Sequence, residues 1–233
     1  TVEQNQKHLS ATQVKNVAGK NYYFAGWSDK DPNLTRDIYP ADDTKLTALY
    51  KGSQLSGDAS AYTNNSQHKI VRTTDGWLHQ TYVSMNHVWI EHSSNGGTSW
   101  FIGNNGQPLD NGEGKCPSID WWYTQSSAGH PENHNLVVAY QQKENSAYSI
   151  RYAIFEKQSS TYIKKSLLSS ETLYLASNES YTSNANPNIT VGGNNNDSRG
   201  YFVLTFEKKN ASDAGIYWIY GQISWNGVGI SNS

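Results

Sequence analysis

Apolar and polar residues alternate in short runs along most of the chain, and turn-forming residues separate these runs. The segments Trp77–Val83 and Val88–His92 follow the period of two that is typical of a half-buried β-strand. An apolar stripe with the helical period of about 3.6 residues never persists beyond about two turns. The pattern therefore predicts an all-β chain with almost no helix.

One order of elements recurs three times after residue 65. It consists of a short strand, a turn with Gly or Asn, an alternating strand, a loop and a second alternating strand, and we interpret it as a four-stranded sheet. The predicted strands are His68–Arg72, Trp77–Val83 and Val88–His92, then Pro117–Asp120, Asn135–Gln141 and Ser149–Phe155, and finally Pro187–Val191, Tyr201–Phe206 and Gly215–Ile223. Each sheet alone would expose an apolar face, so neighbouring sheets are expected to stack.

Residues 1–51 are predicted to form a small, separate β-module. Two short strands, Asn21–Trp27 and Lys45–Tyr50, stand between turn-rich segments in this part of the chain. The segment 52–64 is polar and contains glycine, so we predict a linker there. The three repeated units then occupy residues 65–233.

The composition agrees with short strands and excludes several classes of partner. Only 16% of the residues are charged, while 16 Tyr and 8 Trp stand beside abundant Ser, Asn, Thr and Gly. The net charge is −2 and the Lys and Arg residues are scattered, so we predict no nucleic-acid binding. No apolar run is long enough to cross a membrane, so we predict no membrane insertion. The single cysteine, Cys116, excludes an internal disulfide and is predicted to be buried.

The most specific motif follows the strand Val88–His92 and runs from Ser93 to Trp100. Its expected roles are local: Asn95 folds back onto backbone N–H groups, Gly97 adopts a positive φ, and Trp100 is an apolar anchor. The motif residues are Ser93, Asn95, Gly97, Ser99 and Trp100. The segment resembles the Asp-box, Ser-x-Asp-x-Gly-x-Thr-Trp, of sialidase-like and BNR-repeat β-propellers, from which Asn95 and Ser99 depart.

The resemblance implies a partial β-propeller of about three four-stranded blades. Closed propellers have about four to eight blades, so the rest of a parent chain or partner subunits are expected to complete the ring. A different β-sandwich is the alternative. In that family the Asp-box lies on the blade periphery, away from the active site, so the motif implies a fold and no catalytic role.

The N-terminal part carries a second resemblance. Its segments Phe24–Asp29, Arg36–Ile38 and Leu46–Lys51 resemble small β-repeats that occur in tandem in very large secreted bacterial surface proteins. This implies an extracellular or cell-surface location. Because the chain opens at Thr1 without a methionine, we expect a piece of a longer polypeptide.

The catalytic residues of a sialidase are not matched. That family uses three arginines for the substrate carboxylate, a Tyr nucleophile with a Glu, and an Asp. Here Arg36 belongs to the N-terminal module, Arg72 lacks the family's sequence setting, and Arg151 stands in an alternating strand. Tyrosines are too plentiful to single out one as a nucleophile, and Tyr217 with Glu207 is one example of a Tyr and Glu pair.

Other catalytic and metal-binding patterns are equally weak. The carboxylates Asp110, Glu113, Asp120 and Glu132 lack an apolar setting that would raise a pKa. His130 and His134 have a metal-like spacing, but Pro131 disfavours the helix that this spacing needs. We therefore predict no catalytic residue, no metal site and no cofactor.

Three consecutive aromatic residues are the predicted ligand-binding residues: Trp121, Trp122 and Tyr123. Aromatic faces can stack on sugars, although packing in a core is the competing interpretation. We predict a non-catalytic extracellular module for recognition, adhesion or scaffolding that binds glycans or other surface proteins. The alternatives are a sialidase-like glycoside hydrolase with further catalytic residues on blades outside this chain, and a structural subunit of a surface assembly or filament.

Overall fold

A computed structural model describes residues 6–40, 44–59, 61, 67–124, 133–165, 172–176, 179–193, 199–209, 214–224 and 227–231. The strands in these ranges pair antiparallel, and a single short 3-10 turn, Asn104–Gly106, is the helical element among them. The prediction of an all-β chain is therefore confirmed. Two compact units make up the chain: Thr1–Leu55 with Asn105–Gln107, and Ser56–Asn104 with Pro108–Ser233.

The N-terminal unit contains two small sheets. One pairs β1 (Lys7–Ser10) with β4 (Thr35–Ile38), and the other has the order β2 (Val14–Val17), β3 (Lys20–Trp27) and β5 (Ala48–Gly52). Its buried aromatic residues come from β3: the ring of Phe24 lies 5.8 Å from the rings of both Trp27 and Tyr50, edge to face.

An arginine braces one loop of this unit. The Arg36 guanidinium reaches Asp29 at 2.5 Å and Asp31 at 2.7 Å. Hydrogen bonds from Arg36 lower the pKa of both carboxyl groups. Arg36 therefore has a local structural role within the N-terminal unit.

The larger unit contains three antiparallel sheets, and in each of them four strands pair in the order of the chain. The first sheet consists of β6 (Ile70–Arg72), β7 (Leu78–Ser84), β8 (His87–Ser93) and β9 (Phe101–Ile102). The second sheet consists of β10 (Gly114–Thr124), β11 (Asn133–Glu144), β12 (Ala147–Gln158) and β13 (Thr161–Lys164), with β14 (Thr172–Ala176) also paired to β12. The third sheet consists of β15 (Asn188–Gly193), β16 (Arg199–Lys208), β17 (Gly215–Ser224) and β18 (Gly227–Ser231).

The strongly alternating strands lie where the sequence predicts them. Trp77–Val83 and Val88–His92 correspond to β7 and β8, and Gly215–Ile223 corresponds to β17. Pro117–Asp120 is part of a longer strand, β10. The strand predicted at Lys45–Tyr50 starts too early, because β5 begins only at Ala48.

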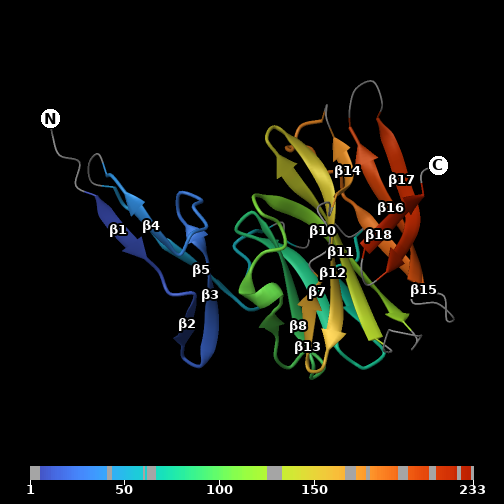
Figure 1. The fold of residues 1–233 in the computed structure, drawn as a ribbon, viewed down its shortest axis with the longest axis horizontal. Coiled ribbons are helices and arrows are strands. Elements are labelled where there is room, and N and C mark those ends of the chain that lie inside the picture. The colour runs from blue at the N-terminus through green and yellow to red at the C-terminus, as the bar shows by residue number, and fades with distance from the viewer. Residues whose placement is uncertain are drawn as a thin grey trace. The chain divides into compact units, whose positions relative to one another are not determined.

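The second sheet carries apolar side chains on both of its faces. Consecutive residues of β11 point to opposite sides of the sheet. Val137 lies in one core cluster with Phe202 of the third sheet, whereas Val138 lies in another with Val88 and Ile90 of the first sheet. The second sheet therefore lies between the other two, and Figure 1 shows β10–β12 between β7–β8 and β15–β18.

The two ends of this stack differ. On the first sheet, Tyr82, Trp89 and Glu91 belong to the face turned away from the second sheet, and all three are buried. On the third sheet, the face turned away from the second sheet carries exposed apolar side chains, among them Ile216 and Trp218. One end of the stack is covered and the other is open.

Candidate functional site

The first strands of the three sheets begin close together. The side-chain amide of Gln67, just before β6, donates hydrogen bonds to the carbonyl oxygens of Cys116 at 2.7 Å and Pro187 at 2.5 Å. The Ile119 N–H donates to the His68 carbonyl at 2.9 Å. One buried glutamine thus connects the starts of all three sheets.

Two polar side chains of β10 join the second sheet to the third. The Ser118 hydroxyl accepts a hydrogen bond from the Ile189 N–H at 3.1 Å. The Asp120 carboxylate accepts from the Val191 N–H at 2.7 Å and from the Thr190 hydroxyl at 3.1 Å. These bonds fix the approach of β15 to β10.

A β-bulge interrupts β10 at this point. The register shifts between Lys115 and Ser118, and Cys116 has a φ of 51°, a value that residues other than glycine seldom adopt. Proline in a strand is confined to edges, strand starts and bulges, so Pro117 is the one sequence signal for this irregularity. Cys116 is buried, as predicted, and burial raises the pKa of its thiol.

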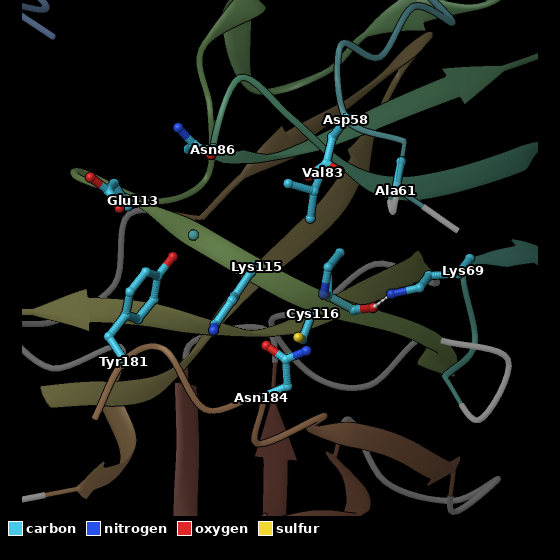
Figure 2. A pocket seen from close by; sticks show the side chains of 12 residues that line it. Asp58, Ala61, Lys69, Val83, Asn86, Glu113, Lys115, Cys116, Tyr181 and Asn184 are labelled. Carbon is cyan, nitrogen blue, oxygen red and sulfur yellow. Dashed lines mark hydrogen bonds between the residues drawn. The ribbon is translucent and has the colours of Figure 1, made fainter. Parts of the chain in front are cut away.

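A pocket of about 210 Å³ opens beside the bulge, within the larger unit (Figure 2). Figure 2 shows Lys69 and Tyr181 on opposite sides of the pocket, with Lys115 and Cys116 between them. The polar lining consists of Asp58, Lys69, Asn86, Glu113, Lys115, Tyr181 and Asn184. The pocket thus offers ammonium groups, carboxylates, amides and a phenol to a small polar ligand.

Two lysines, Lys69 and Lys115, bring positive charge to the pocket beside the carboxylates Asp58 and Glu113. Lys69 donates hydrogen bonds to the Gln67 side chain at 3.0 Å and to the Pro117 carbonyl, and burial lowers its pKa to about 8. Lys115 donates to the Thr182 carbonyl at 3.3 Å, and burial lowers its pKa also. Across the described ranges of the chain, neither ammonium forms an ion pair with a carboxylate.

Several charged groups at the pocket lie around the ring of Tyr181. The ammonium of Lys115 lies 4.5 Å from the centre of the Tyr181 ring, and that of Lys143 lies 5.7 Å from it. Glu113 pairs with Lys143 at 3.3 Å. Burial raises the pKa of Tyr181, so its hydroxyl stays protonated and can donate a hydrogen bond.

The three aromatic residues that the sequence singles out lie on two faces of β10, and none of them lines the pocket. Trp122 is 2% exposed in the core between the second and third sheets, so it presents no surface to a ligand. Trp121 and Tyr123 are partly buried and flank His134, with ring centres 5.9 Å and 5.1 Å from the imidazole.

The segment that resembles an Asp-box forms a tight turn after β8. The Asn95 side chain accepts a hydrogen bond from the Ser99 N–H at 2.9 Å, and the Ser93 hydroxyl accepts one from the Gly97 N–H at 2.9 Å. Gly97 has a φ of 92°, and the Trp100 indole donates to its carbonyl at 3.0 Å. These contacts are internal to the turn and brace it.

The residues considered for catalysis or metal binding have other partners. Arg151 pairs with Glu144 at 2.9 Å. Tyr217 lies opposite Phe206, so it points to the other side of β16 and β17 from Glu207. The His134 imidazole is 2.6 Å from the Thr74 hydroxyl, whereas His130 lies outside the described residues.

The described ranges contain no cluster of three His, Cys, Asp or Glu side chains that could hold a metal ion. They also contain no helix with the length and apolar character needed to cross a membrane. Comparison of the chain with protein-family models, with curated proteins and with solved structures finds no match.

Proposed function

We propose that this chain is a non-catalytic recognition module of an exported surface protein, and that its pocket binds a carbohydrate with an acidic group. In this proposal the three stacked sheets are blades of a propeller. Four strands pair in chain order in each sheet, and the first strands begin side by side, which supports that arrangement. The Asp-box resemblance supports it independently.

The pair Lys69 and Lys115 carries the proposal of an acidic ligand. Both ammonium groups are partly desolvated, and their charges have no carboxylate partner in the described ranges. A ligand carboxylate would supply the missing counter-charge and form charge-assisted hydrogen bonds, which are about twice as strong as neutral ones.

The rest of the lining favours a sugar over a bare anion. The amides of Asn86 and Asn184 and the phenol of Tyr181 can exchange hydrogen bonds with hydroxyl groups. Pockets for drug-sized ligands have about 300–1,000 Å³, so a pocket of about 210 Å³ fits a single sugar unit. The proposed ligand is therefore one acidic sugar residue, free or at the end of a glycan.

The test is calorimetric titration of the full chain with glucuronic acid, N-acetylneuraminic acid and, as the neutral control, glucose. Lys69→Met and Lys115→Met are each expected to weaken binding of an acidic sugar at least tenfold, which corresponds to about 1.4 kcal/mol. Lys20→Met, in the N-terminal unit, is the matched control and leaves the affinity unchanged. Binding is also expected to weaken as the pH rises above about 8, because Lys69 then loses its charge.

Three outcomes would contradict the proposal. Equal affinities for glucose and for an acidic sugar would show that the lysine charges do not contribute to binding. An affinity that neither lysine substitution changes would place the ligand elsewhere. Hydrolysis of a fluorogenic sialoside by the purified chain would contradict the non-catalytic assignment and favour the glycoside hydrolase.

A further inference from the structure

The open face of the third sheet carries five large apolar side chains. Exposed residues alternate with buried ones along most of β16, and with partly buried ones along most of β17, as expected for a sheet with one face on the core. The exposed fractions are 53% for Tyr201, 42% for Val203, 72% for Ile216, 54% for Trp218 and 38% for Tyr220. A face in contact with water would be expected to carry polar residues at these positions.

These side chains form one continuous patch. Val203 lies directly opposite Tyr220 in the antiparallel ladder, and the rings of Trp218 and Tyr220 stack with centres 5.4 Å apart. Together the five side chains expose roughly 500 Å² of surface, as large as the biggest apolar patch of a typical monomer. We call this surface, made of Tyr201, Val203, Ile216, Trp218 and Tyr220, the open face.

The stack itself indicates what covers the open face. The first sheet packs one of its faces on the second sheet, and the second sheet packs its other face on the third. A further antiparallel sheet is therefore a suitable cover for the open face. The outward face of the first sheet is already buried at Tyr82 and Trp89, so among the three sheets a second copy offers an exposed apolar face of its own at the open face.

We propose that the open face is the interface of a homodimer in which β16 and β17 of one copy pack on the same strands of a second copy. Such an interface is self-complementary under two-fold symmetry and leaves no open end, so assembly stops at two copies. The two faces together bury about 1,000 Å², which is the lower limit for a specific interface.

The charges on this side of the sheet allow self-association. Thr205 lies among the apolar residues and is neutral, as is Gln222 opposite Tyr201. Glu207 is paired with Lys209 at 3.0 Å, so the side chains that the structure describes on this face bring no unpaired like charges together. A polysaccharide is a less suitable occupant, because the aliphatic Val203 and Ile216 offer no hydrogen bonds to hydroxyl groups.

The test is sedimentation equilibrium of the full chain from about 1 to about 100 μM, a range over which mass action populates a dimer of micromolar affinity. We expect a dimer, and we expect Ile216→Lys and Trp218→Gln to weaken it at least tenfold. Leu175→Lys is the matched control, because Leu175 is 62% exposed on β14, outside the open face. Far-UV circular dichroism establishes that each variant is folded.

A second variant tests the geometry without disturbing the apolar side chains. Thr205→Cys places a thiol opposite Trp218 among the apolar residues of the open face. Mild oxidation should therefore give a disulfide-linked dimer, whereas Leu175→Cys should not. A monomer at 100 μM, or a dimer that the open-face variants leave unchanged, would overturn the inference. So would a monomer whose tryptophan fluorescence responds to a soluble polysaccharide. The pocket variants Lys69→Met and Lys115→Met should leave the monomer–dimer equilibrium unchanged. Failure of one proposal therefore does not imply failure of the other.

Discussion

His79 and His92 lie opposite each other on the face of the first sheet that is turned toward the second sheet, with their Nδ1 atoms 2.7 Å apart. One ring must donate this hydrogen bond and the other must accept it, so the accepting ring is neutral in the folded state. The Tyr162 ring lies 4.3 Å from His79 and 5.4 Å from His92. Burial strongly lowers the pKa of both imidazoles, and His92 lowers that of His79 further.

This pair predicts a loss of stability in mild acid. The unfolded imidazoles take up protons below a pKa of about 6.5, whereas the folded ones do not. The free energy of unfolding should therefore be fully retained above that pH and fall below it, by about 1.4 kcal/mol per pH unit for each imidazole. Urea unfolding between pH 7 and pH 5 measures the slope.

The double variant His79→Phe/His92→Phe is expected to reduce this slope. His68→Asn is the control, since His68 is exposed and its substitution should leave the slope unchanged. A double variant with the full slope of the original chain would show that other groups cause the acid sensitivity.

The residue types predict the geometry of local turns well. They predict the solvent exposure of individual side chains poorly. The roles of Asn95 and Gly97 follow from the short-range preferences of an amide side chain and of glycine, and the turn has that geometry. Which of two adjacent tryptophans is buried depends on the neighbouring sheets. Trp122 faces the third sheet, whereas Trp121 lies on the opposite face of β10, beside His134.

At the scale of elements, the contact between the second and third sheets depends on few polar groups. Asp120 provides acceptors for two N–H groups and one hydroxyl, and one of those N–H groups is its own neighbour, Trp121. Replacement by alanine leaves the Val191 N–H without its acceptor. Leaving a buried donor unsatisfied costs about 1–3 kcal/mol.

We therefore expect Asp120→Ala to lower the free energy of unfolding by about 1–3 kcal/mol. Thr190→Val removes a single hydrogen bond at an exposed residue and should cost less than about 0.5 kcal/mol. Chemical denaturation of both variants measures the difference. If the two substitutions cost the same, the bond to Val191 contributes little to the sheet contact.

The sequence predicts the long strands and misses the short ones. Apolar and polar residues alternate clearly in the sequences of β7, β8 and β17. By contrast, β2 is exposed along its whole length, and Thr161–Lys164 is a short strand at the edge of β12, so neither shows an apolar period. The pocket could not be predicted either, because Lys69, Lys115 and Tyr181 come together only through the stacking of sheets.

At the scale of the whole molecule, the two core clusters share the second sheet. Val137 and Val138 are neighbours in β11, yet they belong to different clusters. Loss of either cluster therefore exposes one face of the same sheet. We expect the larger unit to unfold in a single cooperative transition.

Substitutions in the two clusters test this cooperativity. Leu136→Ala, in the cluster with the first sheet, and Leu204→Ala, in the cluster with the third, should each lower the free energy of unfolding by about 2–5 kcal/mol. Both should shift the same transition when tryptophan fluorescence and circular dichroism are followed in urea. Two transitions, each shifted by one substitution only, would contradict a shared core.

The order of strand pairing has a consequence for synthesis on the ribosome. Nearly every ladder of the larger unit joins strands that follow one another in the chain; the pairing of β14 with β12 is the exception. Each sheet can therefore close its hydrogen bonds soon after it leaves the exit tunnel, with little loop-closure entropy. The face of the second sheet that carries Val137 stays exposed until β15–β17 have been made. During that interval the nascent chain is expected to bind chaperones that recognise apolar strands, and a pause in translation before residue 188 would lengthen it.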